Sequence, residues 1–357
     1  MSITGTILRS KALAALTTPH GVDRYLEQLN PMWAAHDVRA RLVDVRREVD
    51  VPGQPPVATL TFQPTSTWAG HRAGQFVQVG VEINGARRTT RCFTVSSPDS
   101  RPGDRFTITM RANPDGQVSR FLVEEARPGQ IVHLSQADGD FTLPDQVPGH
   151  VLFITGGSGI TPAMSMLRSL LRRTHRGQIT FLHYAQSPDH QIFRDELAEI
   201  ATAGYGIDLH LVYPEAGGRN FSALELERLV PGFRDVDTWL CGPAGLVDAV
   251  RPAYEGSDKL RVEYFKPPTF SGVAGGEVSF AQSGVAAENS GESLLEQAEA
   301  AGLKPTFGCR MGICFSCTAV KKDGTVRNIL TGETSSLPDE EIRICVSTPE
   351  GDCSVDL

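Results

Sequence analysis

CRMGICFSC (residues 309–317) places three cysteines in the spacing C-x4-C-x2-C, and a fourth cysteine, Cys345, follows on a later stretch. This spacing is typical of plant-type [2Fe–2S] clusters, in which one tight loop supplies three thiolates and the fold brings in the fourth. Gly308 and Gly312 suit such a loop, because glycine lets backbone N–H groups approach the cluster sulfurs closely. A structural zinc site is the alternative, although zinc sites usually pair two C-x2-C knuckles. The predicted metal ligands are Cys309, Cys314, Cys317 and Cys345.

The residues around this loop predict a small α+β domain at 277–357. EVSFAQSGVAAEN (277–289) has the pattern of a hairpin, and Ser293 with Glu296 forms a capping box for a short helix. Two further strands are expected after the cysteine loop. In front of the domain, PPTFSGVAGG (267–276) is rich in proline, glycine and serine, which predicts an interdomain linker.

Most of the chain's net charge of −8 lies in this last domain, where 13 Asp and Glu face 6 Lys and Arg. An acidic module on a nearly neutral body suits docking to a basic partner. A solvated surface that only keeps a small domain soluble is the alternative. The negative total excludes nucleic acid as the main partner.

The sequence predicts a cytoplasmic protein. It has no apolar run of 18 or more residues, so no membrane span is expected. Arg9, Ser10 and Lys11 interrupt the N-terminal apolar stretch, which therefore does not resemble a signal peptide. In the cytoplasm thiols stay reduced, so clustered cysteines indicate metal binding rather than disulfides.

Upstream of the linker, short apolar runs alternate with amphipathic stretches. VLFIT (151–155), ITFLHYA (179–185), LHLVYP (209–214) and TWLC (238–241) have the composition of buried parallel strands. The stretches between them have helical periodicity, so we expect a βαβ-type domain with a parallel sheet.

GGSGITP (156–162) joins the first of these strands to a helix that Pro162 is expected to open. A glycine-rich turn before a helix lets a dinucleotide pyrophosphate approach the backbone, and the helix dipole favours its charge. The loop is not the G-x-G-x-x-G fingerprint, so a tight structural turn is the alternative. Cys241-Gly242-Pro243 ends the last strand, where open α/β sheets bind ligands.

The chain from Val38 to about residue 148 has the pattern of an antiparallel barrel. Apolar and polar residues alternate after Val38, and further short strand candidates follow, separated by Gly, Pro, Asp and Asn turns. These candidates are VATLTF, QFVQVGV, RRTTRCFTV, RFTITMR and QIVHLS.

One predicted barrel strand carries Arg91, Phe93 and Thr94. These residues could supply a flavin with an arginine for phosphate, an aromatic ring against the isoalloxazine, and a hydroxyl near N5. Gly116-Gln117-Val118-Ser119 could offer backbone N–H groups to a pyrophosphate at a helix start. Taken alone, an R-x-F-T tetrapeptide is usually an ordinary strand.

With these three motifs in this order, the chain over residues 38–357 resembles the ferredoxin–NADP reductase superfamily fused to a plant-type ferredoxin. The layout is similar to that of bacterial three-domain oxygenase reductases. The resemblance implies an antiparallel flavin-binding barrel, a parallel-sheet nucleotide-binding domain and a β-grasp ferredoxin domain. The expected parts are an N-terminal extension at 1–35, the FAD barrel at 36–148, the NAD(P) domain at 149–266, the linker at 267–276 and the ferredoxin domain at 277–357.

The flavin motif is similar to the family's R-x-Y-S, with Phe93 in place of Tyr and Thr94 in place of Ser. Both replacements keep the ring and the hydroxyl. Val118 and Ser119 match the family's flavin-pyrophosphate segment. The resemblance implies FAD as the cofactor, with FMN as the alternative, and a catalytic place for Thr94 beside it.

The nucleotide motifs are similar to the family's GGTG-x-x-P loop and to its C-G-P motif beside the nicotinamide, which gives Cys241 a catalytic place. Glu263 and Phe265 resemble the E-x-F that closes the family's nucleotide domain. The implied nucleotide-binding residues are Gly156, Gly157, Ser158, Gly159, Thr161, Pro162, Gly242 and Pro243.

The preference between NADPH and NADH depends on a phosphate-binding side chain. NADPH-preferring relatives often carry Arg or Ser after the second strand, and HYAQS (183–187) contains no Arg. Ser187 could bond a phosphate and Arg219 could supply charge, so we expect NADPH.

The modules predict a reductase that accepts a hydride from NAD(P)H and releases single electrons through the cluster. TTPHGVDRYLEQLNPMW (17–33) resembles the leader of actinobacterial ferredoxin reductases that serve membrane-bound acyl-CoA desaturases. The expected acceptor is therefore a membrane di-iron fatty-acyl desaturase, which would place the protein at the inner face of the membrane through its partner. A soluble ring-hydroxylating or other oxygenase is the alternative acceptor. A redox-sensing iron–sulfur protein is the alternative outside electron-transfer enzymes.

Overall fold

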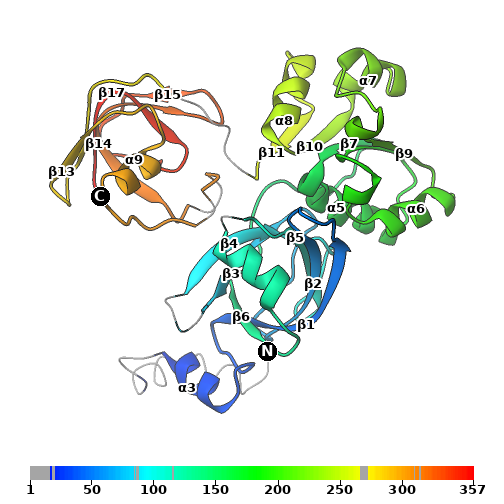
Figure 1. Cartoon of the computed structure of the whole chain (residues 1–357), viewed down its shortest axis with the longest axis horizontal. Helices are drawn as coiled ribbons and strands as arrows, with labels where there is room; N and C mark the ends of the chain where they lie inside the picture. Colours follow the sequence, from blue (N-terminus) through cyan, green and yellow to red (C-terminus); the bar gives the residue numbers. More distant parts are fainter. Residues whose placement is uncertain are drawn as a thin grey trace. The chain divides into compact units, whose positions relative to one another are not determined.

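The computed structural model shows three sheets in two compact units, residues 1–263 and 264–357 (Figure 1). The first unit holds an antiparallel and a parallel sheet, and the second holds a mixed sheet. Within the described ranges, no helix has both the length and the apolar character that a membrane span requires. The structure describes residues 17, 21–83, 85, 88–114, 116–265, 272–308, 310–312 and 315–357.

A short helix, α3 (Val22–Leu29), precedes the first sheet. The carboxylate of buried Asp23 accepts hydrogen bonds from the backbone N–H groups of Ala35 and His36. Arg39, whose side chain is fully buried, donates to the carbonyl of Trp33 and pairs with Glu27. These contacts fasten residues 22–37 to the first barrel strand.

The first sheet closes into a barrel, as the alternating sequence pattern predicts. Its six antiparallel strands follow the order β4-β3-β6-β1-β2-β5, and a bridge between Val95 and Ile108 joins its two edges. Stacked aromatic rings of Phe62, Phe106 and Trp68 lie in its core. The strands are β1 (Val38–Val49), β2 (Val57–Pro64), β3 (Phe76–Val81), β4 (Thr89–Thr94), β5 (Phe106–Arg111) and β6 (Ile131–Leu134). A short helix, α4 (Gln117–Arg120), continues as the π-helical turn η1 (Phe121–Glu125).

The second sheet is parallel, with the strand order β11-β10-β7-β8-β9. Its first helix, α5 (Ile160–Arg172), begins two residues before Pro162, which corrects the expected start. Proline is tolerated there because the first helical turn has no N–H partners to lose. The remaining elements are β7 (His150–Gly156), η2 (Gly157–Gly159), β8 (Gln178–Tyr184), η3 (Pro188–His190), α6 (Arg194–Thr202), β9 (Ile207–Val212), η4 (Pro214–Ala216), α7 (Ala223–Leu229), η5 (Phe233–Asp235), β10 (Asp237–Cys241), α8 (Ala244–Val250), η6 (Arg251–Tyr254) and β11 (Leu260–Glu263).

The second unit contains a mixed sheet in the order β13-β12-β17-β14-β15, with β16 paired to β14. The predicted hairpin and the capping box of Ser293 and Glu296 are both present. The two strands expected after the cysteine loop are in fact four, because β15 and β16 are too short to leave a periodic pattern. The elements are β12 (Glu277–Phe280), β13 (Val285–Glu288), α9 (Leu294–Ala300), β14 (Thr318–Asn328), β15 (Thr334–Ser335), β16 (Glu340–Arg343) and β17 (Ser347–Val355).

Part of the predicted linker is attached to this sheet. Residues 267–271 lie outside the described residues, but Gly272 and Gly275 donate backbone hydrogen bonds to Gly291 and Asn289. The buried side-chain amide of Asn289 also donates to the carbonyls of Val273 and Gly275. The stretch from Gly272 is therefore fixed to the second unit.

Candidate functional site

The fold brings two of the four predicted metal ligands to the same place. Cys317 precedes β14 and Cys345 precedes β17, and both side chains are buried, with 3% exposure each. The backbone N–H of Ile344 donates to the carbonyl of Cys317, which ties these two stretches together. Cys309 and Cys314 lie outside the described residues. The buried sulfurs fit the thiolate ligands that a [2Fe–2S] cluster needs.

Gly312 shows how the cysteine loop is shaped. Its φ of +71° lies in the left-handed region, and a Cβ there would lie 2.8 Å from the side chain of Val346. Its backbone N–H donates to the sulfur of Cys345 at 3.3 Å, the kind of hydrogen bond that tunes a cluster. Its carbonyl accepts a hydrogen bond from Arg343, whose guanidinium also lies over the exposed ring of Phe315.

The two predicted nucleotide motifs are in direct contact. A Cβ on Gly159 would lie 2.2 Å from the carbonyl oxygen of Cys241, so the position accepts no side chain without displacing backbone. Gly156 packs against the ring of Pro243, where a Cβ would meet Cδ at 2.9 Å. A Cβ on Gly242 would lie 3.1 Å from the nitrogen of Gly156. The loop after β7 and the end of β10 therefore form one backbone surface.

The start of α5 has the features of an anion site. Its N-cap residue is Gly159, and no side chain caps the first turn. Gly157 has a φ of +53° and open space around its Cα. The hydroxyl of Thr161 donates to the carbonyl of Ser158 at 3.0 Å, and the N–H of Ile160 donates to carbonyls of the preceding turn η2. The N–H groups that could face a ligand are therefore those of η2, whose N-cap residue Gly156 supplies no side-chain cap. These residues fit a dinucleotide pyrophosphate.

A buried carboxyl lies beside this surface on the adjacent strand. Glu263 pairs in register with Cys241, and burial raises the pKa of its carboxyl to about 8. Its Oε2 atom has no hydrogen-bond partner among the described residues. Burial, and then the charge of Glu263, raises the pKa of the Cys241 thiol. The sequence indicates Glu263 only through a resemblance, because the burial of this side chain depends on a partner strand.

The predicted flavin residues lie on two neighbouring elements of the barrel. Arg91, Phe93 and Thr94 belong to β4, and Thr94 is buried. Val118 and Ser119 are buried on α4, which packs beside β4 and follows an uncapped Gly116. The hydroxyl of Thr94 at the buried end of β4 fits a flavin. The uncapped start of α4 fits the pyrophosphate of that flavin.

Ser187 and Arg219, the side chains proposed for phosphate recognition, differ in their surroundings, and His183 begins the same segment as Ser187. His183 is fully buried, and its Nδ1 lies 2.7 Å from the hydroxyl of Thr155. Burial lowers the pKa of His183 to about 3, so the ring is neutral and cannot attract a phosphate. The hydroxyl of Ser187 already bonds His190 at 2.8 Å, whereas Arg219 is exposed.

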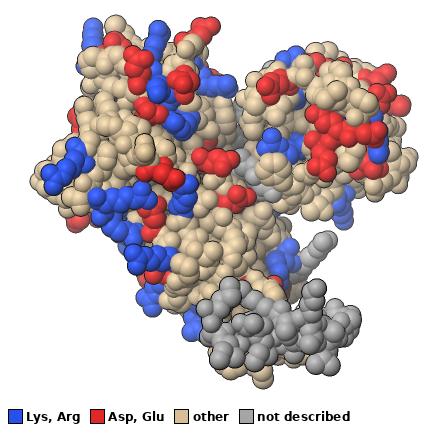
Figure 2. Space-filling model, turned by 180° about the vertical axis from the view of Figure 1, so that it is seen from behind, with Lys and Arg blue, Asp and Glu red and all other residues tan. Residues whose placement is uncertain are grey.

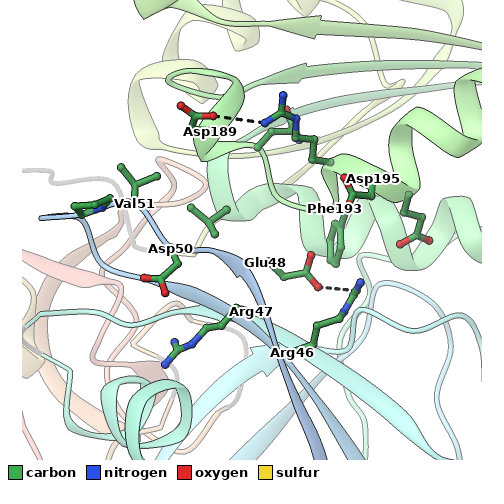
Figure 3. Close-up of a pocket in the computed structure, with 13 residues that line it drawn as sticks. Arg46, Arg47, Glu48, Asp50, Val51, Asp189, Phe193 and Asp195 are labelled. Atoms are coloured by element: carbon green, nitrogen blue, oxygen red, sulfur yellow. Dashed lines mark hydrogen bonds and ion pairs between the residues drawn. The ribbon is translucent and has the colours of Figure 1, made fainter.

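A cavity of about 390 Å³ opens elsewhere in the first unit (Figure 3). Barrel residues 46–52 form one wall, with Arg46 paired to Glu48. Residues before and within α6 form the other wall, with Arg194 paired to Asp189. No local sequence pattern marks these residues, because the pocket depends on segments far apart in the chain.

Comparison with known proteins agrees with these motifs. Residues 153–252 match the family model of the oxidoreductase NAD-binding domain. Residues 280–350 match the model of the 2Fe-2S iron-sulfur cluster binding domain. The two matched regions contain the glycine loop and the cysteine loop, respectively.

Similar proteins cover nearly the whole chain. A NADPH oxidoreductase of Mycobacterium tuberculosis is 38% identical, over 97% of this chain and 91% of its own length. The glycine betaine monooxygenase reductase subunit of Pseudomonas aeruginosa is 29% identical, over 80% of this chain and 87% of its own. The solved structure of phthalate dioxygenase reductase, 21% identical, covers 89% of this chain and 97% of its own with a TM-score of 0.61, which shows a shared fold.

Proposed function

Because this chain belongs to the ferredoxin–NADP reductase superfamily, among its flavin, NAD(P) and [2Fe–2S] reductases, we propose that it supplies single electrons to a separate oxygenase component. The chain is an NAD(P)H-dependent electron-transfer oxidoreductase that uses FAD and a [2Fe–2S] cluster.

The observation that carries the NAD(P)H-dependent half of the proposal is the packing of Gly159 against Cys241. This contact supports one nucleotide site in which the uncapped turn of α5 holds the pyrophosphate and the end of β10 holds the nicotinamide. Thr94 and Arg91 would orient the flavin on β4, and Ser119 would lie at its pyrophosphate. When bound, the flavin converts a two-electron hydride transfer into single-electron transfers. The chain's own residues supply orientation and exclude water.

For the cluster, we propose Cys309, Cys314, Cys317 and Cys345 as ligands. The burial of Cys317 and Cys345 and the hydrogen bond from Gly312 to the Cys345 sulfur support this set. Arg343 would hold the loop in shape through the Gly312 carbonyl. The four proposed ligands all belong to the second unit, so electrons would leave the chain there.

An oxygenase is favoured as the acceptor because one similar protein is named as the reductase subunit of a monooxygenase. A membrane desaturase stays the second candidate, because residues 17–33 resemble the leader of desaturase reductases. We propose NADPH as the electron donor, which the name of the Mycobacterium tuberculosis relative supports.

The first test is steady-state reduction of cytochrome c by the purified chain, with NADPH and NADH in parallel. We expect NADPH to support cytochrome c reduction with a lower KM and a higher kcat/KM than NADH. Iron and sulfide should each be present at about two per chain. Stoichiometric zinc without labile sulfide would refute the cluster. Turnover with a purified oxygenase, but not with a membrane desaturase, would then identify the acceptor class.

A further inference from the structure

One face of α5 is hydrogen-bonded to the segment that follows the flavin strand. Ser165 donates to the carbonyl of Ser97 at 2.6 Å, and Ser169 accepts from the backbone N–H of Asp99 at 2.9 Å. Arg172 donates to the carbonyl of Asp99 at 2.6 Å. These side chains lie at helical spacing on one face, so the helix and residues 97–99 are joined at several points.

Arg168 is the central member of this face. Its Nε and Nη2 donate to the two carboxylate oxygens of Glu196 at 2.8 and 2.5 Å, and its Nη1 donates to the carbonyl of Ser96. The guanidinium carbon also lies 4.5 Å from the centre of the Phe193 ring. The side chain is 17% exposed, so these contacts are largely shielded from water. One arginine therefore connects the barrel with two parts of the parallel-sheet domain.

Apolar contacts also hold the two sheets together, but they are less directional. Val49, Val57 and Ala73 from the barrel side belong to the same buried cluster as α5 residues. Hydrophobic burial depends on area and tolerates sliding, whereas a bidentate arginine pair requires one geometry. On the side of Phe193, the cavity of about 390 Å³ separates residues 46–52 from α6 (Figure 3). Packing is therefore incomplete where Arg168 makes its contacts.

The two ends of this connection are the two halves of the proposed reaction site. The helix α5 begins at Ile160, within the glycine loop. Ser96 lies two residues after Thr94, the last residue of the flavin strand β4. Hydride transfer requires reacting atoms at about 3–3.5 Å, and a misplacement of about 1 Å can cost a hundredfold in rate. A rigid link between loop and strand would fix that separation.

We propose that Arg168 is a positioning residue for hydride transfer: through Ser96 and Glu196 it sets the orientation of the nucleotide loop over the flavin strand. The inference rests on the proposed placement of the flavin at Thr94 and the nucleotide at the glycine loop. It assigns Arg168 no contact with either cofactor. The arginine acts by holding α5, which carries the loop, against residues 96–99.

The test compares Arg168→Met with Arg176→Met, a matched control at an exposed arginine just beyond the same helix. In stopped-flow experiments with NADPH, we expect flavin reduction at saturation to slow roughly tenfold to a hundredfold in Arg168→Met. The Kd for NADPH should change less than about twofold, because the loop itself is intact. The control should match the unaltered chain in both.

Two measurements do not depend on turnover. The long-wavelength charge-transfer absorbance of the nucleotide–flavin complex, which reports ring stacking, should weaken in Arg168→Met. Amide hydrogen exchange of residues 94–100 should become faster, since their tie to α5 is loosened. An unchanged rate and absorbance would overturn the proposal even if exchange became faster, because Arg168 would then be purely structural. Weaker NADPH binding in Arg168→Met with an unchanged rate of flavin reduction would overturn the proposal as well.

Glu196→Gln provides a second, milder variant should Arg168→Met fail to fold. It keeps the shape of the partner and removes its charge, so we expect a smaller slowing in the same direction. An unchanged rate in Glu196→Gln would then overturn the proposal. Failure of the proposed function is distinguishable, because the unaltered chain would then not reduce its flavin with NADPH at all.

Discussion

The glycine loop at 156–162 and the cysteine loop at 309–317 are both tight turns, yet they are shaped by different forces. Gly159 fits directly against the backbone of Cys241, so the first loop is formed by the fold alone. At the cysteine loop the described sulfur of Cys317 is buried, as is that of Cys345 before β17, and thiolates there would be stabilised by the metal that we propose they hold. Steric contacts therefore shape the glycine loop, whereas the shape of the cysteine loop depends on its ligand.

This difference predicts which functions separate under mutation. Damage to the cysteine loop should remove one cofactor and leave the first unit intact. Damage to the glycine loop should harm nucleotide binding together with the local fold. The predictions below test this contrast, beginning with the largest expected effect.

Replacing Cys345 by Ser should abolish the cluster and stop electron transfer to protein acceptors. A serine hydroxyl does not replace a thiolate in holding the two irons. Flavin reduction by NADPH should persist, because the first unit contains none of the four ligands. The measurements are iron content, cytochrome c reduction and stopped-flow flavin reduction.

The matched control for that variant is Cys353→Ser, at a buried cysteine of the same unit outside the ligand set. It should retain its iron. Loss of flavin reduction in a folded Cys345→Ser protein would contradict the separation of the two loops.

Replacing Gly159 by Ala should lower kcat/KM for NADPH by about a hundredfold, since the new Cβ would lie 2.2 Å from the Cys241 carbonyl and displace the loop. Gly245→Ala is the control, because its position in α8 has open space for a Cβ. Iron content should stay normal in both variants. A fully active Gly159→Ala protein would show that the loop is not sterically fixed.

Much of this contrast could be predicted from local sequence. The alternating strands, the parallel-sheet runs and the capping box of Ser293 and Glu296 all appear where their patterns place them. Such patterns work because each depends on residues only a few positions apart. The glycine loop was recognised as a turn for the same reason.

Features that depend on distant partners could not be predicted. Glu263 is buried because β11 lies beside β10, and its Oε2 has no hydrogen-bond partner within the part of the chain that the structure describes. The contact of Arg168 with Ser96 joins the two sheet domains of the first unit. The start of α5 at Ile160 was missed because proline is allowed within a first turn. No periodicity marks β15, which has two residues.

Glu263 allows the glycine-loop region to be tested by pH. Its pKa of about 8 lies above its ordinary value of 4.5, so the folded state holds the proton more tightly than the unfolded state. The stabilisation is complete below pH 4.5 and is lost as the pH rises through 8. We therefore expect the Tm of the chain to fall with rising pH more steeply than that of Glu263→Gln.

The Tm difference between the two proteins should widen from pH 5 to pH 9, measured by scanning calorimetry without added nucleotide. Glu255→Gln, at an exposed glutamate of the same sheet domain, controls for the replacement of a carboxyl group by an amide. Parallel pH profiles for the chain and Glu263→Gln would show that the buried carboxyl is ionised in the folded state.

The smallest expected effect concerns the surface of the second unit. On the face shown in Figure 2, acidic side chains gather on this unit, whereas the first unit carries both acidic and basic side chains. Glu333 and Glu341 line a hollow of about 480 Å³ in the second unit. Half-buried Glu340 also lines it but pairs with buried Lys321 and accepts from Ser335, so it is structural and unsuitable for charge reversal. The pair Glu333→Lys and Glu341→Lys should raise the KM for the acceptor protein roughly two- to fivefold at low salt. The increase should vanish near 1 M salt, where the Debye length is about 3 Å. Flavin reduction should be unchanged, which separates docking from chemistry.

Glu215→Lys, at an exposed position of the first unit, controls for a general change of charge. A KM that ignores both salt and the double reversal would mean that these acids only solvate the domain, and the contrast between the units would then lie in their loops alone.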